Sequence, residues 1–131
     1  MRLLLDTHVA VWAIAKPAAV PERWRSEIEE PSNRVAVSIA ALWEIAIKNS
    51  LEGRRASHFD VTLDQALSAF EEVGFDVLPV GPSALREVGR LPHLHRDSFD
   101  RLFIATAIAD DWRLLTHDRQ LADYGPSVIL I

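Results

Sequence analysis

The stretch MRLLLDTHVAVW (residues 1–12) sets the expected fold, because three consecutive leucines lead straight into Asp6 before apolar residues resume at Val9. A short, continuous apolar run that ends in a polar residue is typical of a strand buried on both faces of a sheet. Helix is expected over residues 7–15, with Pro17 just beyond its end. A carboxylate at the end of a buried strand loses its hydration, so Asp6 needs either hydrogen-bonding partners or a function.

Short apolar runs and helical segments alternate through the rest of the chain. Strands are expected at residues 2–6, 35–37, 75–80, 113–118 and 127–131. Helices are expected at residues 7–15, 21–30, 39–52, 62–74, 81–91 and 97–112, with a helical turn at 119–125. Ser38 can cap the helix that follows it, and Gly53 suits the far end of that helix. A capping box joins Thr62 to Gln65, and Gly74 ends their helix. This alternation indicates an α/β fold with a mostly parallel central sheet flanked by helices.

The composition is that of a soluble globular protein, and we expect residues 1–131 to form a single domain. Hydrophobic residues make up 49% of the chain and charged residues 25%. The chain has no cysteine, which excludes disulfides, thiolate zinc sites and cysteine nucleophiles and leaves oxygen or imidazole to hold any metal ion. The formal net charge of −5 argues against non-specific coating of nucleic acid, yet it is compatible with a carboxylate-lined metal site.

The N-terminal apolar stretch resembles a secretory signal only superficially. Asp6 and His8 interrupt it and leave it too short for the apolar region of a signal peptide. No run approaches the roughly 20 apolar residues that a membrane span needs. We therefore expect a cytoplasmic protein without a membrane segment.

Acidic residues fall where the strands of such a sheet end. Asp6 ends the first strand, and Asp118 lies at the end of the strand expected at residues 113–118. Asp100 lies in the first turn of the helix before that strand, and Glu44 lies in the helix after the second strand. Ligands of parallel α/β sheets bind beyond the carboxyl ends of the strands. These acids are therefore candidates for one functional site.

Each acid alone has a structural alternative. Asp6 and Asp118 could be helix caps or turn residues. Glu44 could pair with Lys48 at i+4 on a solvated helix face. Apolar neighbours around Glu44 and Asp100 argue against a solvated face for these two acids. Asp97, three residues before Asp100, is favoured as the cap of its helix, and whether it also joins the site stays open.

Four carboxylates at one sheet edge repel one another unless a cation lies among them. Hard divalent ions prefer oxygen ligands, which predicts Mg²⁺, with Mn²⁺ able to replace it. The histidines offer an alternative, since His93 and His95 flank one leucine, and His8 and His117 lie near the expected site. Their spacing does not match known zinc motifs.

Three stretches resemble the conserved motifs of PIN-domain ribonucleases, specifically toxins of the VapC type from type II toxin–antitoxin systems. LLLDTHVAVW resembles the first motif, SIAALWEIAIK the second, and HRDSFDRLFIATAIADDWRLLTHD the third and fourth together. The match covers essentially the whole chain in order. Ser98 stands where many relatives have proline. The resemblance implies a PIN-like three-layer sandwich and assigns the metal site and catalysis to Asp6, Glu44, Asp100 and Asp118.

The resemblance also implies a function: a Mg²⁺-dependent endoribonuclease that cleaves RNA phosphodiester bonds, has a cognate antitoxin and forms a homodimer. Thr7, Ser38 and Thr116 are candidates to orient ligands from behind the site. The candidates to contact RNA phosphates are Lys48, Arg96, Arg101 and Arg119. Trp12, Trp24 and Trp43 fall on expected helices and are candidates for a partner surface unless they fill the core.

Other functions fit the sequence less well. A phosphatase that uses Asp6 as nucleophile, like the haloacid dehalogenases, needs a second Asp two residues later, where this chain has His8. A response-regulator receiver needs an adjacent acidic pair near its first strand, which is missing here. A non-catalytic PIN-like module that binds metal or RNA remains the alternative, and the presence of all four acids argues against it.

Overall fold

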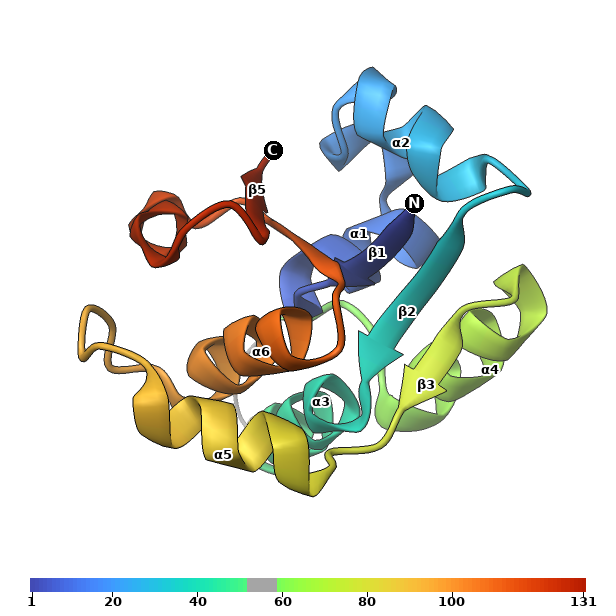
Figure 1. Cartoon of the computed structure of the whole chain (residues 1–131). Coiled ribbons are helices and arrows are strands. Elements are labelled where there is room, and N and C mark those ends of the chain that lie inside the picture. The colour runs from blue at the N-terminus through green and yellow to red at the C-terminus, as the bar shows by residue number, and fades with distance from the viewer. Residues whose placement is uncertain (52–58) are drawn as a thin grey trace.

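The structure, a computed structural model, describes residues 1–51 and 59–131. Within these residues a five-stranded sheet has the order β3-β2-β1-β4-β5, and every neighbouring pair is parallel (Figure 1). The strands are β1 (Arg2–Leu5), β2 (Arg34–Ser38), β3 (Asp76–Leu78), β4 (Arg113–Thr116) and β5 (Val128–Leu130). The prediction of a mostly parallel sheet is confirmed, since each pairing that is described is parallel.

Helices connect the strands and cover both faces of the sheet. The α-helices are α1 (Thr7–Ala15), α2 (Glu22–Glu29), α3 (Ile39–Leu51), α4 (Leu63–Val73), α5 (Pro82–Arg90) and α6 (Ser98–Ala109). Short 3₁₀ helices occur at η1 (Pro17–Ala19) and η2 (Arg119–Tyr124), of which only the second was expected as a helical turn. Among the described residues, no helix is long and apolar enough to cross a membrane.

The helix ends follow the sequence chemistry where they are described. The Thr62 hydroxyl and the Gln65 side chain form the predicted capping box at the start of α4. Gly74 ends that helix at φ 80°, a left-handed conformation that disfavours residues with a Cβ. The expected cap at Gly53 lies outside the described residues.

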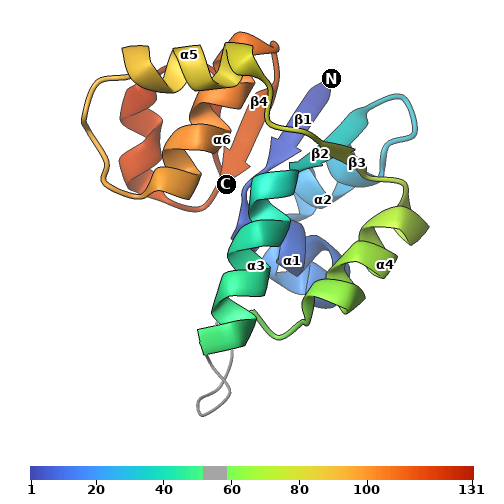
Figure 2. The ribbon, with the colours of Figure 1, turned by 90° about the horizontal axis from the view of Figure 1, so that it is seen from below.

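Alternating side chains of β1 pack into two separate hydrophobic cores, one on each face of the sheet. Leu3 and Leu5 point into a core built with α1 and α4, where they meet residues such as Phe70. Leu4 points the other way, into a core with α6 that contains Phe103. All three leucines are fully buried. A strand buried on both faces explains the continuous apolar run, and Figure 2 shows α5 and α6 on one side of the strands with α1 and α4 on the other. The three-layer α/β/α arrangement is therefore confirmed.

The carboxyl ends of β1, β2 and β4 meet at one edge of the sheet. In register, Leu5 of β1 lies beside Val37 of β2 and Leu115 of β4. The backbone N–H of Asp6 donates to the Leu115 carbonyl at 3.1 Å, which extends the β1–β4 pairing by one residue. Helices α1 and α3 and the 3₁₀ helix η2 all begin at this edge. Residues far apart in the chain thus arrive at one place.

Leu4 provides a test of this arrangement. It is fully buried and lies in register with Ala36 and Leu114, so Leu4→Ala leaves a cavity in the sheet core. We expect the free energy of unfolding to fall by about 2–5 kcal/mol. Leu85→Ala on α5, where the side chain is 58% exposed, is the matched control and should change it by less than about 0.5 kcal/mol. Urea unfolding measures both, and equal losses would contradict the burial of Leu4.

Candidate active site

A cavity of about 340 Å³ opens at the carboxyl edge of the sheet. Its lining residues are Asp6, His8, Glu44, Lys48, Asp97, Asp100, His117, Asp118 and Arg119. All four acids singled out in the sequence line this one cavity. They come from four different places in the chain, and the parallel topology brings them together.

Asp6 is buried, with 4% of its surface exposed. One oxygen, Oδ1, accepts from the Val9 N–H at 2.8 Å and caps α1, and Oδ2 accepts from the Thr116 hydroxyl at 2.5 Å. Burial raises the pKa of Asp6, while the hydrogen bonds from Thr116 and Val9 act in the opposite direction. Asp6 is therefore both a helix cap and a cavity carboxylate, and the two interpretations do not compete.

Glu44 is buried as well, which removes the interpretation as a solvated helix residue. Its Oε1 accepts from the Thr7 hydroxyl at 2.5 Å, and its Oε2 pairs with the Lys48 ammonium at 2.9 Å. The glutamate side chain is 8% exposed and the lysine side chain 30%. The expected i+4 pair thus forms, but it forms at the wall of the cavity.

Asp97 and Asp100 have different positions at the start of α6. The Asp97 side chain accepts from the Asp100 N–H at 2.9 Å and caps the helix, as expected. Partial burial raises the pKa of Asp100 to about 7, the charges of Asp97 and Asp6 add to this rise, and a hydrogen bond with His95 opposes it. The pKa of Asp100 is therefore raised first by burial and only second by the negative charge of neighbouring acids.

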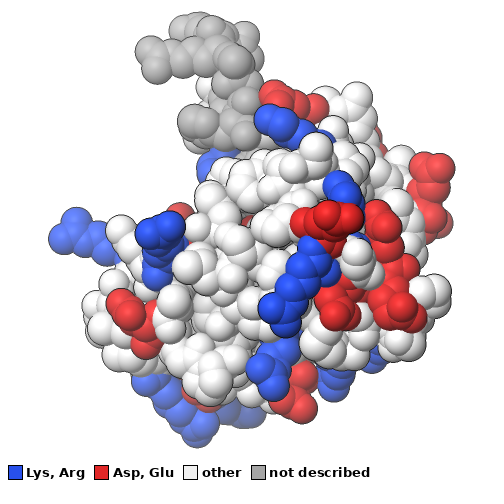
Figure 3. Space-filling model, turned by 90° about the horizontal axis from the view of Figure 1, so that it is seen from above, with Lys and Arg blue, Asp and Glu red and all other residues white. Residues whose placement is uncertain are grey.

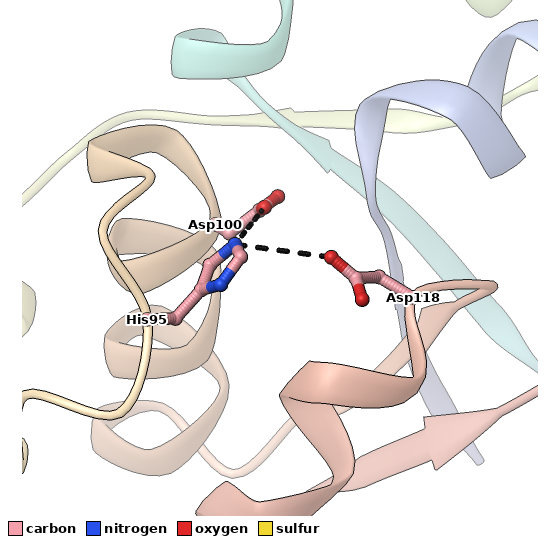
Figure 4. A group of neighbouring side chains, drawn as sticks. All are labelled: His95, Asp100 and Asp118. Atoms are coloured by element: carbon pink, nitrogen blue, oxygen red, sulfur yellow. Dashed lines mark hydrogen bonds and ion pairs between the residues drawn. The ribbon is translucent and has the colours of Figure 1, made fainter.

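Asp100 and Asp118 both lie near one ring nitrogen of His95 (Figure 4). His95 Nε2 lies 3.0 Å from Asp100 Oδ2 and 3.8 Å from Asp118 Oδ2. The remaining Asp118 oxygen, Oδ1, accepts from the Gln120 N–H at 2.9 Å and caps η2. In the part of the chain that is described, these three residues form a group whose ligand atoms all lie within 4.8 Å of one another.

A buried arginine holds the segment that carries His95. The His95 N–H donates to the Tyr124 hydroxyl at 2.9 Å, and Arg101 Nη1 donates to the same hydroxyl at 3.1 Å. Arg101 also donates to the carbonyls of Pro92 and Val88 and is only 8% exposed. Arg101 was expected to contact phosphate, but it is not among the residues that line the cavity, and its guanidinium is turned towards the chain segment before α6.

The other expected residues also fall into groups. Thr7 and Thr116 hold cavity carboxylates, as expected of residues behind a site. The buried Ser38 hydroxyl accepts from the Ala40 N–H at 3.1 Å and caps α3, without a described contact to a carboxylate. Arg119 lines the cavity and is exposed, and Arg96 is exposed beside His95.

Sequence reasoning missed the place of His95. In the sequence, His95 stands out only beside His93 in the zinc alternative, whose spacing does not match a known motif. Its approach to two carboxylates depends on the path of the segment between α5 and α6. The hydrogen bond from the His95 backbone N–H to the Tyr124 hydroxyl joins residues 29 positions apart in the chain, so no local pattern could have found it.

Residues 3–125 match the PIN domain family. This chain belongs to the PIN domain family. It is 32% identical over 125 residues to Ribonuclease VapC22 of Mycobacterium tuberculosis, a match that covers 93% of this chain and 91% of that relative. The resemblance stated from the sequence motifs is thereby confirmed.

Solved structures share the fold of this PIN domain. One is VapBC2 from Rickettsia felis bound to a DNA fragment from its promoter, with a TM-score of 0.70, 21% identity and coverage of 100% of this chain and 98% of that chain. Another is VapBC-5 from Mycobacterium tuberculosis, with a TM-score of 0.58, 27% identity and coverage of 99% and 97%.

The cap at Asp97 of the PIN domain can be tested by stability alone. Asp97→Ala removes the acceptor for the Asp100 N–H, and we expect the free energy of unfolding to fall by about 1 kcal/mol. Asp97→Ser keeps a side-chain oxygen at the cap and should retain most of that stability. Chemical denaturation compares the two variants. If serine and alanine were equally destabilising, the carboxylate would matter for a reason other than the cap.

The raised pKa of Asp100 predicts a pH-dependent stability for the metal-free protein. The folded state holds the proton up to about pH 7, whereas an unfolded Asp releases it near pH 3.9, so this contribution to stability is present at low pH and lost as the pH rises towards 7. Asp100→Asn removes the ionisation. In chelator, its melting temperature should exceed that of the wild type by more at pH 8 than at pH 5. A difference that is constant with pH would contradict the raised pKa.

Proposed function

We propose that this PIN domain is a metal-dependent endoribonuclease that cleaves RNA phosphodiester bonds, and that it is the toxin of a toxin–antitoxin pair. The observation that carries the proposal is the convergence of Asp6, Glu44, Asp100 and Asp118 on one cavity. The relative named Ribonuclease VapC22 supports the substrate class. Metal dependence is the general property of PIN-domain nucleases, and the acidic cavity fits it.

The donor set fits a hard divalent cation. The four carboxylates share their cavity with only two lysine or arginine side chains among the described lining residues, Lys48 and Arg119. A divalent ion would offset the repulsion that contributes to the raised pKa of Asp100. We propose Mg²⁺ as the ion, with Mn²⁺ able to replace it, and the four acids as its ligands and as the catalytic groups. Such an ion, when bound, activates water and stabilises charge that develops on the phosphate.

The surrounding residues position these carboxylates. Thr7 fixes one oxygen of Glu44, and Thr116 fixes one oxygen of Asp6. Hydroxyl donors of this kind orient ligands without adding charge. Ser38 acts indirectly, because it caps the helix that carries Glu44.

Positive charge for the RNA backbone comes from few residues. Arg119 lines the cavity and Arg96 lies on the exposed segment before α6, so both are proposed to contact phosphates. Lys48 already forms an ion pair with Glu44, so any contact it makes with a phosphate must coexist with that pair. On the face drawn in Figure 3, basic and acidic side chains are interspersed across the described surface rather than joined in one basic area. This face therefore offers no single basic area along which RNA could bind.

We also propose a protein antitoxin as partner and a homodimer as the assembly, with the cytoplasm as the place of action. Solved relatives described as VapBC toxin–antitoxin systems support the first of these. Trp43 is 61% exposed on α3 and remains a candidate for a partner contact. Trp12 and Trp24 are partly buried and pack against the core, as their alternative interpretation required.

The proposal predicts cleavage that depends on the ion and on the ligands together. The purified protein should cut RNA with Mg²⁺, stop in chelator and recover with added Mg²⁺ or Mn²⁺. Asp100→Ser should fold but lose activity by about 100-fold or more, since loss of even an outer partner of a metal site costs 10–100-fold. Glu71→Ser on the exposed surface of α4 is the control with unchanged activity. Full activity in chelator would contradict the metal-dependent mechanism, and the absence of any cleavage with Mg²⁺ would favour the non-catalytic module.

A further inference from the structure

His95 is not among the residues that line the cavity, but its ring lies beside two of the cavity carboxylates, Asp100 and Asp118. Its side chain is only 15% exposed and comes from the segment between α5 and α6. Figure 4 shows Nε2 of its ring pointing towards both aspartates, at 3.0 Å from Asp100 and 3.8 Å from Asp118. A nitrogen and two carboxylate oxygens within 4.8 Å of one another form a compact mixed donor group.

This histidine is held from behind by an organised network. Tyr124 accepts from the His95 backbone N–H, and Arg101 donates to that tyrosine and to two backbone carbonyls of the preceding segment. Arg101 is nearly buried, which is costly for a charged group unless its donors are satisfied. A surface ion pair would need no such support, because exposed pairs contribute little to stability. The network instead fixes the backbone from which the imidazole reaches the carboxylates.

We propose that His95 is a ligand of the bound cation through Nε2, together with Asp100 and Asp118. The proposal rests on the proposed function, which places a cation among these carboxylates. Both Mg²⁺ and Mn²⁺ accept carboxylate and water ligands, but Mn²⁺, as a first-row transition metal ion, accepts an imidazole nitrogen more readily than Mg²⁺, which keeps oxygen ligands and waters. His95 therefore increases the affinity for Mn²⁺ more than the affinity for Mg²⁺, and gives this site a selectivity that four carboxylates alone would not have.

Two other roles for His95 lead to different measurements. A positively charged imidazole between two carboxylates would take the place of the cation, so its removal would tighten the binding of both ions. A histidine that only supports the segment before α6 would, once removed, leave the ratio of the two affinities unchanged. If His95 is a ligand, its removal lowers the affinity for Mn²⁺ selectively. The two affinities taken together with their ratio therefore separate the three roles.

The test is ion binding to the full metal-free chain, without RNA. Calorimetry gives the affinities for Mn²⁺ and Mg²⁺ in the wild type, His95→Ala and the control His93→Ala, whose side chain is exposed two residues away. We expect His95→Ala to weaken Mn²⁺ binding by about tenfold or more and Mg²⁺ binding by less than about threefold. His93→Ala should bind both ions as the wild type does.

Pulsed electron paramagnetic resonance of bound Mn²⁺ supplies a direct readout of the nitrogen ligand. The wild type and His93→Ala should show coupling to a histidine nitrogen, and His95→Gln should lose it. Glutamine has a similar volume and polarity to histidine, so this variant shows whether His95 supplies the nitrogen ligand even if the alanine variant fails to fold. Nitrogen coupling that persists in His95→Gln, or an unchanged affinity ratio in His95→Ala, overturns the proposal.

The outcomes also separate this proposal from the proposed function. Bound Mn²⁺ without nitrogen coupling in the wild type overturns the role of His95 and leaves the carboxylate site intact. Tighter binding of both ions in His95→Ala overturns ligation in favour of a charged imidazole. A wild-type chain that binds neither ion overturns the metal-dependent function, and the role of His95 with it.

Discussion

Parallel pairing of β1 with β4 is the constraint on which the site depends. It continues one residue past β1, where the Asp6 N–H reaches the Leu115 carbonyl, and it brings the Thr116 hydroxyl to the Asp6 carboxylate. The two strands are separated by most of the chain, yet their side-by-side ends determine where Asp6 and Asp118 lie. Because parallel strands end at the same edge of the sheet, a residue that directly follows such a strand lies at that edge. The acids lie close together because of the sheet topology, and no local sequence motif alone would bring them together.

Three carboxylates that line the cavity also stabilise the fold. Asp6, Asp97 and Asp118 each accept a hydrogen bond from a backbone N–H at the start of a helical segment. Backbone N–H groups at helix starts lack partners within the helix, and the positive end of the helix dipole favours negative charge. A capping oxygen is thus stabilised where a second oxygen can face the cavity. Asp6 and Asp118 can therefore cap a helical segment and line the cavity at the same time.

The elements and the acids could be predicted from local sequence, whereas the environment of the acids could not. Continuous apolar runs predicted the strands, and Thr62, Gln65 and Gly74 predicted the ends of α4. The roles of Arg101 and His95 depend on Tyr124 of η2, which approaches them from later in the chain. An arginine next to Asp100 looks the same in sequence whether it faces RNA or supports a buried segment. Only the tertiary path of residues between α5 and α6 decides between the two.

Some carboxylates of the cavity have a basic side chain as partner and others do not, and this difference connects the stability of the fold to the binding of a cation. Glu44 has Lys48, and Asp100 and Asp118 share His95, whereas within the described residues Asp6 has hydrogen-bond donors but no ion pair. Burial and the neighbouring acids raise the pKa of Asp6 and Asp100, which means that the folded, metal-free chain holds these charges at a cost. A cation that binds the folded state alone recovers this cost and stabilises the fold in proportion to its affinity. Removing one carboxylate should therefore raise the free energy of unfolding of the metal-free protein and lower that of the metal-bound protein. The acids that destabilise the metal-free fold are thus the same acids that line the cavity.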